Sequence, residues 1–191
     1  MEKKYLVFVD VKNGIQSNKY YNMFDNGDGT FTAEYGRVGK TKTTHTYPSR
    51  LWSSKYASKL KKGYEDITDL KTVSSEVVQN SGNAAFDEFY ATFSRYTTDA
   101  VAKTYLSQGA TAKQLEQAQQ LINELSTITD VRKFNTNLLS LYKTIPRQMR
   151  DVREHLLTDI SQKNSFISKE QDALDSMDSA VITSTLNPAR S

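Results

Sequence analysis

Alternation of apolar and polar residues predicts a small antiparallel sheet in the first third of the chain. Segments 4–11 and 19–24 are rich in β-branched and aromatic residues, which favour strands. The run Asp-Asn-Gly-Asp-Gly at 25–29 contains residues that tolerate positive φ, and polar and apolar residues alternate through 30–38, so a hairpin is expected there. The threonine-rich segment 41–47 is predicted as a polar strand at the edge of the sheet.

A helix is predicted at 50–62, with Ser49 as its N-cap and Gly63 as its stop. Its two faces differ in character. The face expected to pack on the sheet carries Trp52, Tyr56 and Leu60. The neighbouring basic stripe, expected to face solvent, carries Lys55, Lys59 and Lys62.

The remainder of the chain has helical periodicity after a polar stretch at 69–82. Start signals for helices are Thr111, then Thr129 or Asp130, and finally Ser168 with Gln171 in a capping box. The predicted helices are 83–95, 99–106, 111–128, a segment ending at Pro146, an amphipathic but charged segment at 147–160, and one from Ser168. A bundle of five or six helices is expected.

These elements predict an α+β protein: a small antiparallel sheet with one packed helix, followed by an all-α bundle. The expected boundaries are 1–68 for the sheet domain, 69–82 for a linker and 83–191 for the helical domain.

Composition narrows the possible chemistry. There is no cysteine, and the two histidines, His45 and His155, are far apart, which excludes thiolate sites and argues against a multi-histidine metal site. Neither a P-loop nor a calcium loop is complete, and no catalytic motif occurs. We therefore expect no cofactor and no metal, and although the 22 acidic residues leave room for a pair assembled in space, nothing in the sequence points to one. Without a long apolar run or a signal-peptide core, we expect no membrane partner and an intracellular location, nuclear in a eukaryote and cytoplasmic for a bacterial or phage protein.

Positive charge is concentrated near the N-terminus. Residues 1–70 contain twelve basic and eight acidic residues, whereas the rest of the chain has a net charge of −1. Between 29 and 64, eight lysines and arginines accompany a single acid, Glu34. Such an excess attracts polyanions, because each neutralised phosphate releases counterions, although a merely solvated surface gives the same pattern.

Nearly all of residues 4–66 resemble the WGR domain of the DNA-dependent poly(ADP-ribose) polymerases. The resemblance is carried by Asn18-Lys19-Tyr20-Tyr21, by Tyr35-Gly36-Arg37-Val38-Gly39, by the basic helix and by Tyr64-Glu65-Asp66. Segments 111–128, 138–146 and 169–185 resemble, more loosely, the regulatory helical domain that follows WGR in those enzymes.

Two departures from the family pattern stand out. Tyr35 replaces its leading tryptophan, and Arg147-Gln148-Met149-Arg150 stands where the family has His-Asp-Phe-Gly. The family's NAD-consuming transferase domain would begin after Ser191, so the resemblance implies no transferase activity for these residues and an NAD-dependent ADP-ribosyltransferase for a longer parent.

The resemblance implies a double-stranded DNA end or nick with a 5′ phosphate as partner, and an ADP-ribosyltransferase catalytic domain in cis or in trans. The residues expected at the DNA are Asn18, Lys19, Tyr35, Arg37, Lys40, Lys55, Lys59 and Tyr64. Five of them have a plainer interpretation: Tyr35 as a core aromatic, Arg37 as an ion-pair partner of Glu34 or Glu65, Lys55 and Lys59 as solvated charges or general phosphate contacts, and Asn18 as a turn residue.

The function expected from the resemblance is a DNA-break-sensing regulatory module in which DNA binding loosens an autoinhibitory helical domain. We keep two alternatives. One is a free-standing, non-catalytic interaction protein that occupies DNA ends or acts as an adaptor. The other is an RNA- or protein-binding adaptor whose basic patch meets another polyanion.

Overall fold

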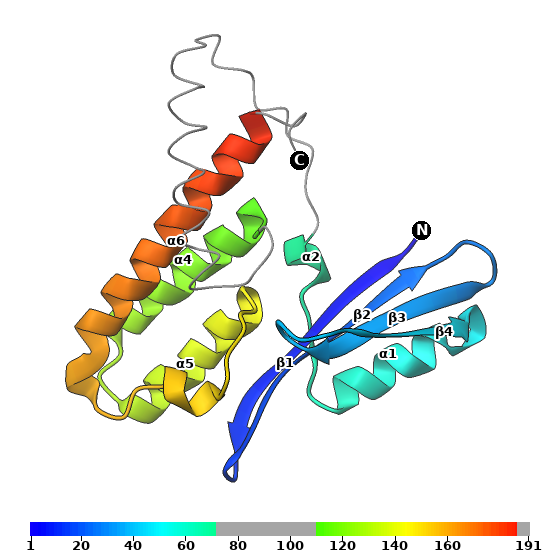
Figure 1. The fold of residues 1–191 in the computed structure, drawn as a ribbon. Coiled ribbons are helices and arrows are strands. Elements are labelled where there is room, and N and C mark those ends of the chain that lie inside the picture. The colour runs from blue at the N-terminus through cyan, green and yellow to red at the C-terminus, as the bar shows by residue number, and fades with distance from the viewer. Residues whose placement is uncertain (72–109, 187–191) are drawn as a thin grey trace.

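The computed structural model describes residues 1–71 and 110–186, with side chains described as far as residue 175 (Figure 1). We call residues 1–71 the sheet lobe and residues 110–186 the helical lobe. Together they form an α+β fold, as predicted. The predicted helices 83–95 and 99–106 and most of the predicted linker lie outside the described residues.

The sheet lobe contains five antiparallel strands in the order β4-β3-β2-β1-β5. They are β1 (Lys3–Lys12), β2 (Ile15–Asp25), β3 (Thr30–Arg37), β4 (Thr43–Pro48) and the short β5 (Glu65–Asp66). The hairpin between β1 and β2 turns at Asn13 and Gly14, both at positive φ. Two consecutive residues with left-handed backbone form the two-residue hairpin turn whose twist matches that of the flanking strands. The hairpin between β2 and β3 and the edge position of β4 are confirmed.

Helix α1 (Trp52–Lys61) covers one face of the sheet and follows a short 3-10 turn, η1 (Ser49–Leu51). The predicted cap at Ser49 is wrong, because the turn moves the N-cap to Leu51 and no side chain caps α1. Trp52 packs edge-on against Phe31, as expected. Leu60, however, is 39% exposed. The helix is rotated so that positions 52, 55, 56 and 59 are its less exposed face, so Lys55 and Lys59 of the basic stripe share the packed side while Lys62 is exposed.

The helical lobe is built on α4 (Ala112–Thr127), α5 (Val131–Thr144) and α6 (Lys163–Leu186), with α2 (Thr68–Lys71) ending the sheet lobe. Thr111 caps α4 in a capping box with Gln114, and Asp130 caps α5, so both start signals are confirmed. Helix α6 begins five residues before Ser168, so that predicted cap is wrong.

Segment 147–160 is not the predicted helix. It is irregular apart from the 3-10 turn η2 (Val152–His155), and a second such turn, η3 (Ile160–Gln162), leads directly into α6. Asp159 caps η3, and its carboxylate accepts a hydrogen bond from the Ser161 amide at 2.8 Å. The start signal of the last helical run is therefore Asp159.

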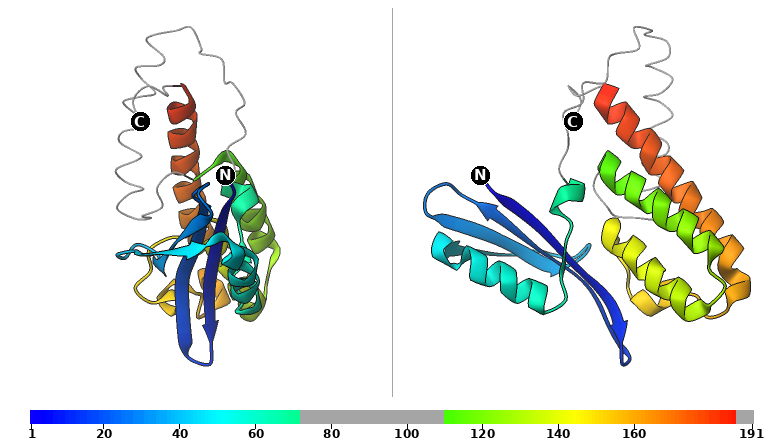
Figure 2. Two further views of the ribbon diagram at one scale, coloured as in Figure 1. Left: turned by 90° about the vertical axis from the view of Figure 1, so that its right-hand side faces the viewer. Right: turned by 180° about the vertical axis from the view of Figure 1, so that it is seen from behind.

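The sheet lies between two apolar cores. On the α1 side the core consists of Leu6, Tyr21, Met23, Phe31 and Ala33. On the other side Val9 and Val11 of β1 join the core of the helical lobe, whose largest fully buried side chains include Tyr142 and Phe134. Helix α6 packs beside α4 (Figure 2). The helical lobe contacts the hairpin of β1 and β2 through α5 and η2 (Figure 1).

Candidate nucleic-acid interface

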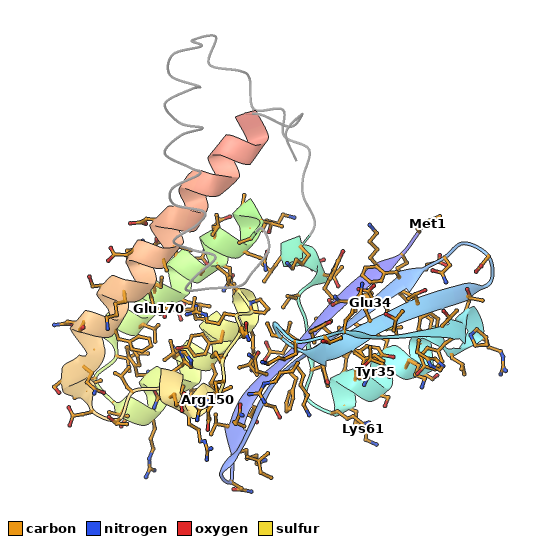
Figure 3. All side chains as sticks on the ribbon, in the orientation of Figure 1. Met1, Glu34, Tyr35, Lys61, Arg150 and Glu170 are labelled. Atoms are coloured by element: carbon orange, nitrogen blue, oxygen red, sulfur yellow. The ribbon has the colours of Figure 1, made fainter. Side chains whose placement is uncertain are left out.

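Two lysines of α1 lie over tyrosine rings of the sheet. The Lys59 Nζ is 4.0 Å from the centroid of the Tyr21 ring, and the Lys55 Nζ is 4.2 Å from that of the Tyr47 ring. Both side chains are partly buried, because their aliphatic stems cover the rings while their ammonium groups reach the edge of the lobe. Figure 3 shows the side chains of this region, with Tyr35 between the sheet and α1.

The rings around Lys59 form a continuous group. Tyr21 and Tyr35, directly opposite each other on β2 and β3, stack with their centroids 5.4 Å apart. The Lys59 ammonium is 5.9 Å from the Tyr35 centroid and 5.4 Å from the Tyr64 centroid. We call Lys19, Lys55 and Lys59 with Tyr21, Tyr35, Tyr47 and Tyr64 the lysine–tyrosine surface.

The electrostatics of this surface are positive. Burial, followed by the charges of Lys62, Lys55 and Lys19, lowers the pKa of Lys59. Burial also raises the pKa of Tyr21 to about 12 and raises that of Tyr64. The two phenols are therefore neutral near pH 7. Among the described residues neither Lys55 nor Lys59 forms an ion pair with a carboxylate.

Four of the eight residues predicted at DNA therefore come together in the α1 region: Tyr35, Lys55, Lys59 and Tyr64. Lys19 is exposed, and its charge contributes to lowering the pKa of Lys59. Its backbone lies opposite that of Arg37 in the register of β2 and β3. Lys40 is exposed in the turn after β3. That any of these residues contacts DNA stays a prediction.

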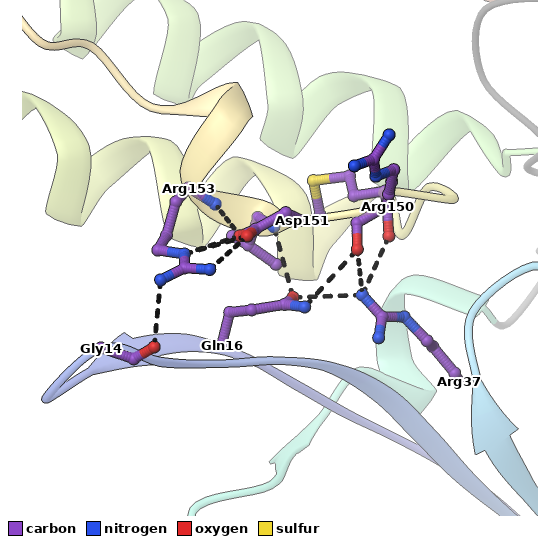
Figure 4. Close-up of polar contacts among 8 residues, drawn as sticks. Gly14, Gln16, Arg37, Arg150, Asp151 and Arg153 are labelled. Atoms are coloured by element: carbon purple, nitrogen blue, oxygen red, sulfur yellow. Dashed lines mark hydrogen bonds and ion pairs between the residues drawn. The ribbon is translucent and has the colours of Figure 1, made fainter.

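Asn18 and Arg37 face the helical lobe instead. The Asn18 side chain is only 1% exposed, and its Nδ2 donates a 2.7 Å hydrogen bond to the carbonyl oxygen of Arg147. The Arg37 Nη2 donates to the carbonyl oxygens of Met149 and Arg150, at 3.2 and 2.6 Å (Figure 4). In this arrangement the Asn18 side chain is not available to a partner in solvent.

Further polar contacts join the two lobes (Figure 4). Arg37 also donates to the Gln16 side chain, which accepts a 3.3 Å hydrogen bond from the Val152 amide. Arg153 donates to the Gly14 carbonyl at 3.2 Å. Its partner Asp151 has a pKa lowered to about 2, chiefly by the hydrogen bond from the Arg153 side chain.

The plainer interpretations of two residues can now be corrected. Arg37 does not pair with Glu34 or Glu65, because those carboxylates bind Lys42 and Lys143 respectively, each at 2.7 Å. Asn18 is not a turn residue, since it lies within β2 and pairs with Val9 of β1. The contact between Lys143 and Glu65 is another link between the lobes.

Sequence reasoning missed two residues of the lysine–tyrosine surface, Tyr21 and Tyr47. Both lie on the α1-facing side of their strands, so strand alternation was the available signal. Strand alternation alone does not place the lysines over these two rings, because that placement depends on the rotation of α1. The contacts of segment 147–150 with Asn18 and Arg37 have no signal in the sequence, where this segment only departs from the family pattern and begins a predicted helix.

Two kinds of feature are absent from the described part of the chain. No group of three or more histidine, aspartate or glutamate side chains is placed there to hold a metal ion. Nor does any helix in the described ranges combine the length and apolar character needed to cross a membrane.

Comparison with known proteins gives one informative match. No family model matches the chain. Over 171 residues it is 37% identical to the uncharacterized protein 101L of Invertebrate iridescent virus 6, and this alignment covers 85% of the chain and 72% of the viral protein.

Proposed function

The chain belongs to the family of protein 101L of Invertebrate iridescent virus 6, and from its own residues we propose that it is a DNA-end- or nick-binding regulatory module of a PARP-like ADP-ribosyltransferase. The observation that carries the proposal is the pair Lys55 and Lys59, held over tyrosine rings with no carboxylate partner among the described residues. The resemblance to WGR and to the regulatory helical domain supplies the rest.

The lysine–tyrosine surface suits a nucleic acid for two physical reasons. Its ammonium groups can replace counterions along a phosphate backbone, which gives affinity without reading sequence. Tyr35 is stacked on Tyr21 through one face and is only partly buried, and an aromatic ring of this kind can stack on an unpaired or terminal base. A broken end or a nick offers both phosphates and an accessible base.

Regulation would act through Arg37. Its backbone pairs with Lys19 of the lysine–tyrosine surface, while its guanidinium binds carbonyl oxygens of the helical lobe. A terminal phosphate near Lys19 would attract this guanidinium, because a charge-assisted bond to phosphate is stronger than one to a neutral carbonyl. DNA binding would thereby weaken the contact between the lobes.

The test is a titration of the full chain with labelled oligonucleotides, followed by fluorescence anisotropy at two salt concentrations. The probes are a 5′-phosphorylated nicked duplex, a blunt duplex, a single strand and an RNA hairpin. We expect tightest binding to the nick. Replacing both lysines (Lys55→Met with Lys59→Met) should reduce the slope of log K against log salt by about 2, since each phosphate contact contributes about 0.9.

The matched control removes the same charge elsewhere. Lys113 and Lys133 are exposed on α4 and α5, and the double change Lys113→Met with Lys133→Met should leave the slope nearly unchanged. Equal losses for the two double variants would show general charge attraction rather than a site. Preference for the RNA hairpin would favour the adaptor alternative over the proposed function.

A further inference from the structure

Strand β4 forms an open edge of the sheet. It is the outermost strand beyond β3, while the helical lobe contacts β1 and β2 (Figure 1). Apart from the ladder with β3, no backbone hydrogen bond joins residues 43–47 to any other described residue. An edge strand in this state presents every second amide and carbonyl to a new strand.

The opposite edge of the sheet is protected. Strand β5 has only two residues, both acidic, and short or charged edge strands resist pairing. At Tyr5 of β1, the carbonyl accepts a hydrogen bond from the Ile67 amide at 2.9 Å, and the amide donates to the Thr68 hydroxyl at 3.0 Å. Strand β4 is longer, and residues 43–47 include no lysine, arginine, acid, glycine or proline. The usual obstacles to edge pairing are therefore absent from β4.

The sequence of β4 is suited to pairing with a second copy of itself. In a symmetric antiparallel pair, the twofold axis is perpendicular to the sheet and passes through one residue of the strand, which then lies opposite its own copy. An axis at His45 pairs residues 43–47 and leaves out Pro48, which has no amide to donate. The other cross-strand pairs are Thr44 with Thr46 and Thr43 with Tyr47, each formed twice.

These pairs match in chemistry. Threonine opposite threonine, and an aromatic ring opposite a β-branched side chain, both stabilise antiparallel strands, and no like charges are set opposite each other. The nearest lysine before the strand, Lys42, is already bound to Glu34 at 2.7 Å. Each copy also brings a ring pair to the axis, because His45 and Tyr47 have centroids 4.2 Å apart. His45 is exposed in the single chain, and a second copy would cover it.

We propose that β4 is a homodimer interface, through which two copies of the chain join their sheets edge to edge with His45 on the twofold axis. Helix α1 leaves this edge open, because its contacts run inward from Tyr47 under Lys55 to Tyr21 under Lys59. Only one short strand of each copy takes part, so the dimer is weak and reversible. The pairing does not rest on the proposed function.

The first experiment uses the absence of cysteine from the chain. Directly opposed residues in an antiparallel ladder have Cα atoms about 4.5–5.5 Å apart, a separation that a disulfide spans. Under mild oxidation, His45→Cys should form a disulfide-linked dimer about tenfold faster than the control Thr136→Cys, because the paired thiols have a high effective concentration. Thr136 is exposed on α5. Non-reducing gel electrophoresis measures both rates, and equal rates would overturn the inference.

Charge variants test the same register without a covalent bond. Thr44→Lys with Thr46→Lys sets like charges opposite each other, and so does Thr44→Asp with Thr46→Asp, so each double variant alone should lose the dimer. Mixing the two should restore it as a heterodimer, because every opposed pair then has opposite charges. Sedimentation velocity over a range of protein concentrations measures association, and circular dichroism verifies that each variant is folded.

The matched control places the same charges away from β4. Thr127→Lys with Thr136→Lys changes exposed threonines of α4 and α5 and should associate as the parent does. A lysine variant of β4 that dimerises like the parent, or a lysine and aspartate mixture that stays monomeric, would overturn the proposed interface. Duplex binding by a chain that is monomeric in all these measurements would refute this inference and leave the proposed function standing.

Discussion

Asn18 makes its contact with the helical lobe through a single hydrogen bond. Its Nδ2 donates to the Arg147 carbonyl at 2.7 Å, while its buried Oδ1 has no hydrogen-bond partner among the described residues. An unsatisfied buried oxygen costs about 1–3 kcal/mol relative to its hydrated state. The bond thus joins the lobes, but the oxygen beside it favours their separation, as the proposed coupling requires.

Asn18→Ala should lower the free energy of unfolding by about 1 kcal/mol, because it leaves the Arg147 carbonyl without its donor, while removal of the unsatisfied Oδ1 offsets part of that cost. Under the proposed coupling, the same variant should bind the nicked duplex more tightly, since less work is needed to free Arg37. Urea denaturation and the anisotropy titration measure the two effects. Asn22→Ala is the control, since Asn22 lies on the same face of β2 four residues away; a weaker duplex affinity in Asn18→Ala would contradict the coupling.

At the scale of elements, α6 is tied to the rest of the helical lobe by a buried ion pair. The Arg147 guanidinium binds both oxygens of Glu170, at 2.9 and 3.0 Å, and its carbon is 4.5 Å from the centroid of the Tyr142 ring. The two side chains are 4% and 8% exposed. One residue therefore links α6 and α5 through its side chain and β2 through its carbonyl oxygen.

Glu170→Ala should destabilise the protein by about 3–5 kcal/mol, because it leaves the Arg147 charge buried without this carboxylate. The double variant Arg147→Met with Glu170→Leu should recover much of that loss, since an apolar pair of similar volume avoids the buried charge. Thermal unfolding followed by circular dichroism compares the variants. A double variant as unstable as Glu170→Ala would show that packing, and not charge, determines the cost.

Local signals were sufficient for some elements and not for others. Thr111 and Asp130 each bind an amide within their own first turn, so the sequence alone identifies them as caps. Segment 147–160 has an amphipathic pattern, but its backbone carbonyls at 147, 149 and 150 accept hydrogen bonds from Asn18 and Arg37. Those donors are more than a hundred residues away, and periodicity cannot reveal them.

The same distinction applies to the candidate site. The lysines could be found from composition, and Tyr35 from the family resemblance. The rotation of α1 that places Lys55 and Lys59 over Tyr47 and Tyr21 depends on how the helix packs across the sheet, which is a tertiary property. The role of Arg37 in joining the lobes depends on the helical lobe for the same reason.

At the scale of the whole molecule, the turn after β3 meets the helical lobe very closely. A Cβ atom added at Gly39 would lie 2.6 Å from the Cβ of Gln148, and Gly39 has a φ of +75°. Gly14 has the same φ, but a Cβ added there would meet nothing within 4 Å. Alanine variants at the two positions therefore distinguish two contributions to the loss of stability. Both variants include the cost of the left-handed backbone, but only the variant at Gly39 includes a clash between the lobes.

Gly14→Ala should cost about 1–2 kcal/mol for its left-handed backbone alone. Gly39→Ala should cost more and should weaken protection of the 147–153 amides in hydrogen exchange, because the new methyl group displaces Gln148. Adding Gln148→Gly to Gly39→Ala should restore part of that protection. If both alanine variants were equally destabilised and the hydrogen exchange of the 147–153 amides were unchanged, the turn at Gly39 would be able to move without disturbing the contact between the lobes.

Strand β1 contributes side chains to both apolar cores, so the two lobes cannot be separated by truncation without exposing part of one core. Leu6 belongs to the core under α1, whereas Val9, three residues further on, belongs to the core of the helical lobe. A fragment ending near residue 68 would leave Val9 and Val11 in water, because the helical lobe that covers them would be missing. Recombinant pieces cut there are poor surrogates for the intact polypeptide, and their tendency to aggregate would say nothing about what the parent recognises.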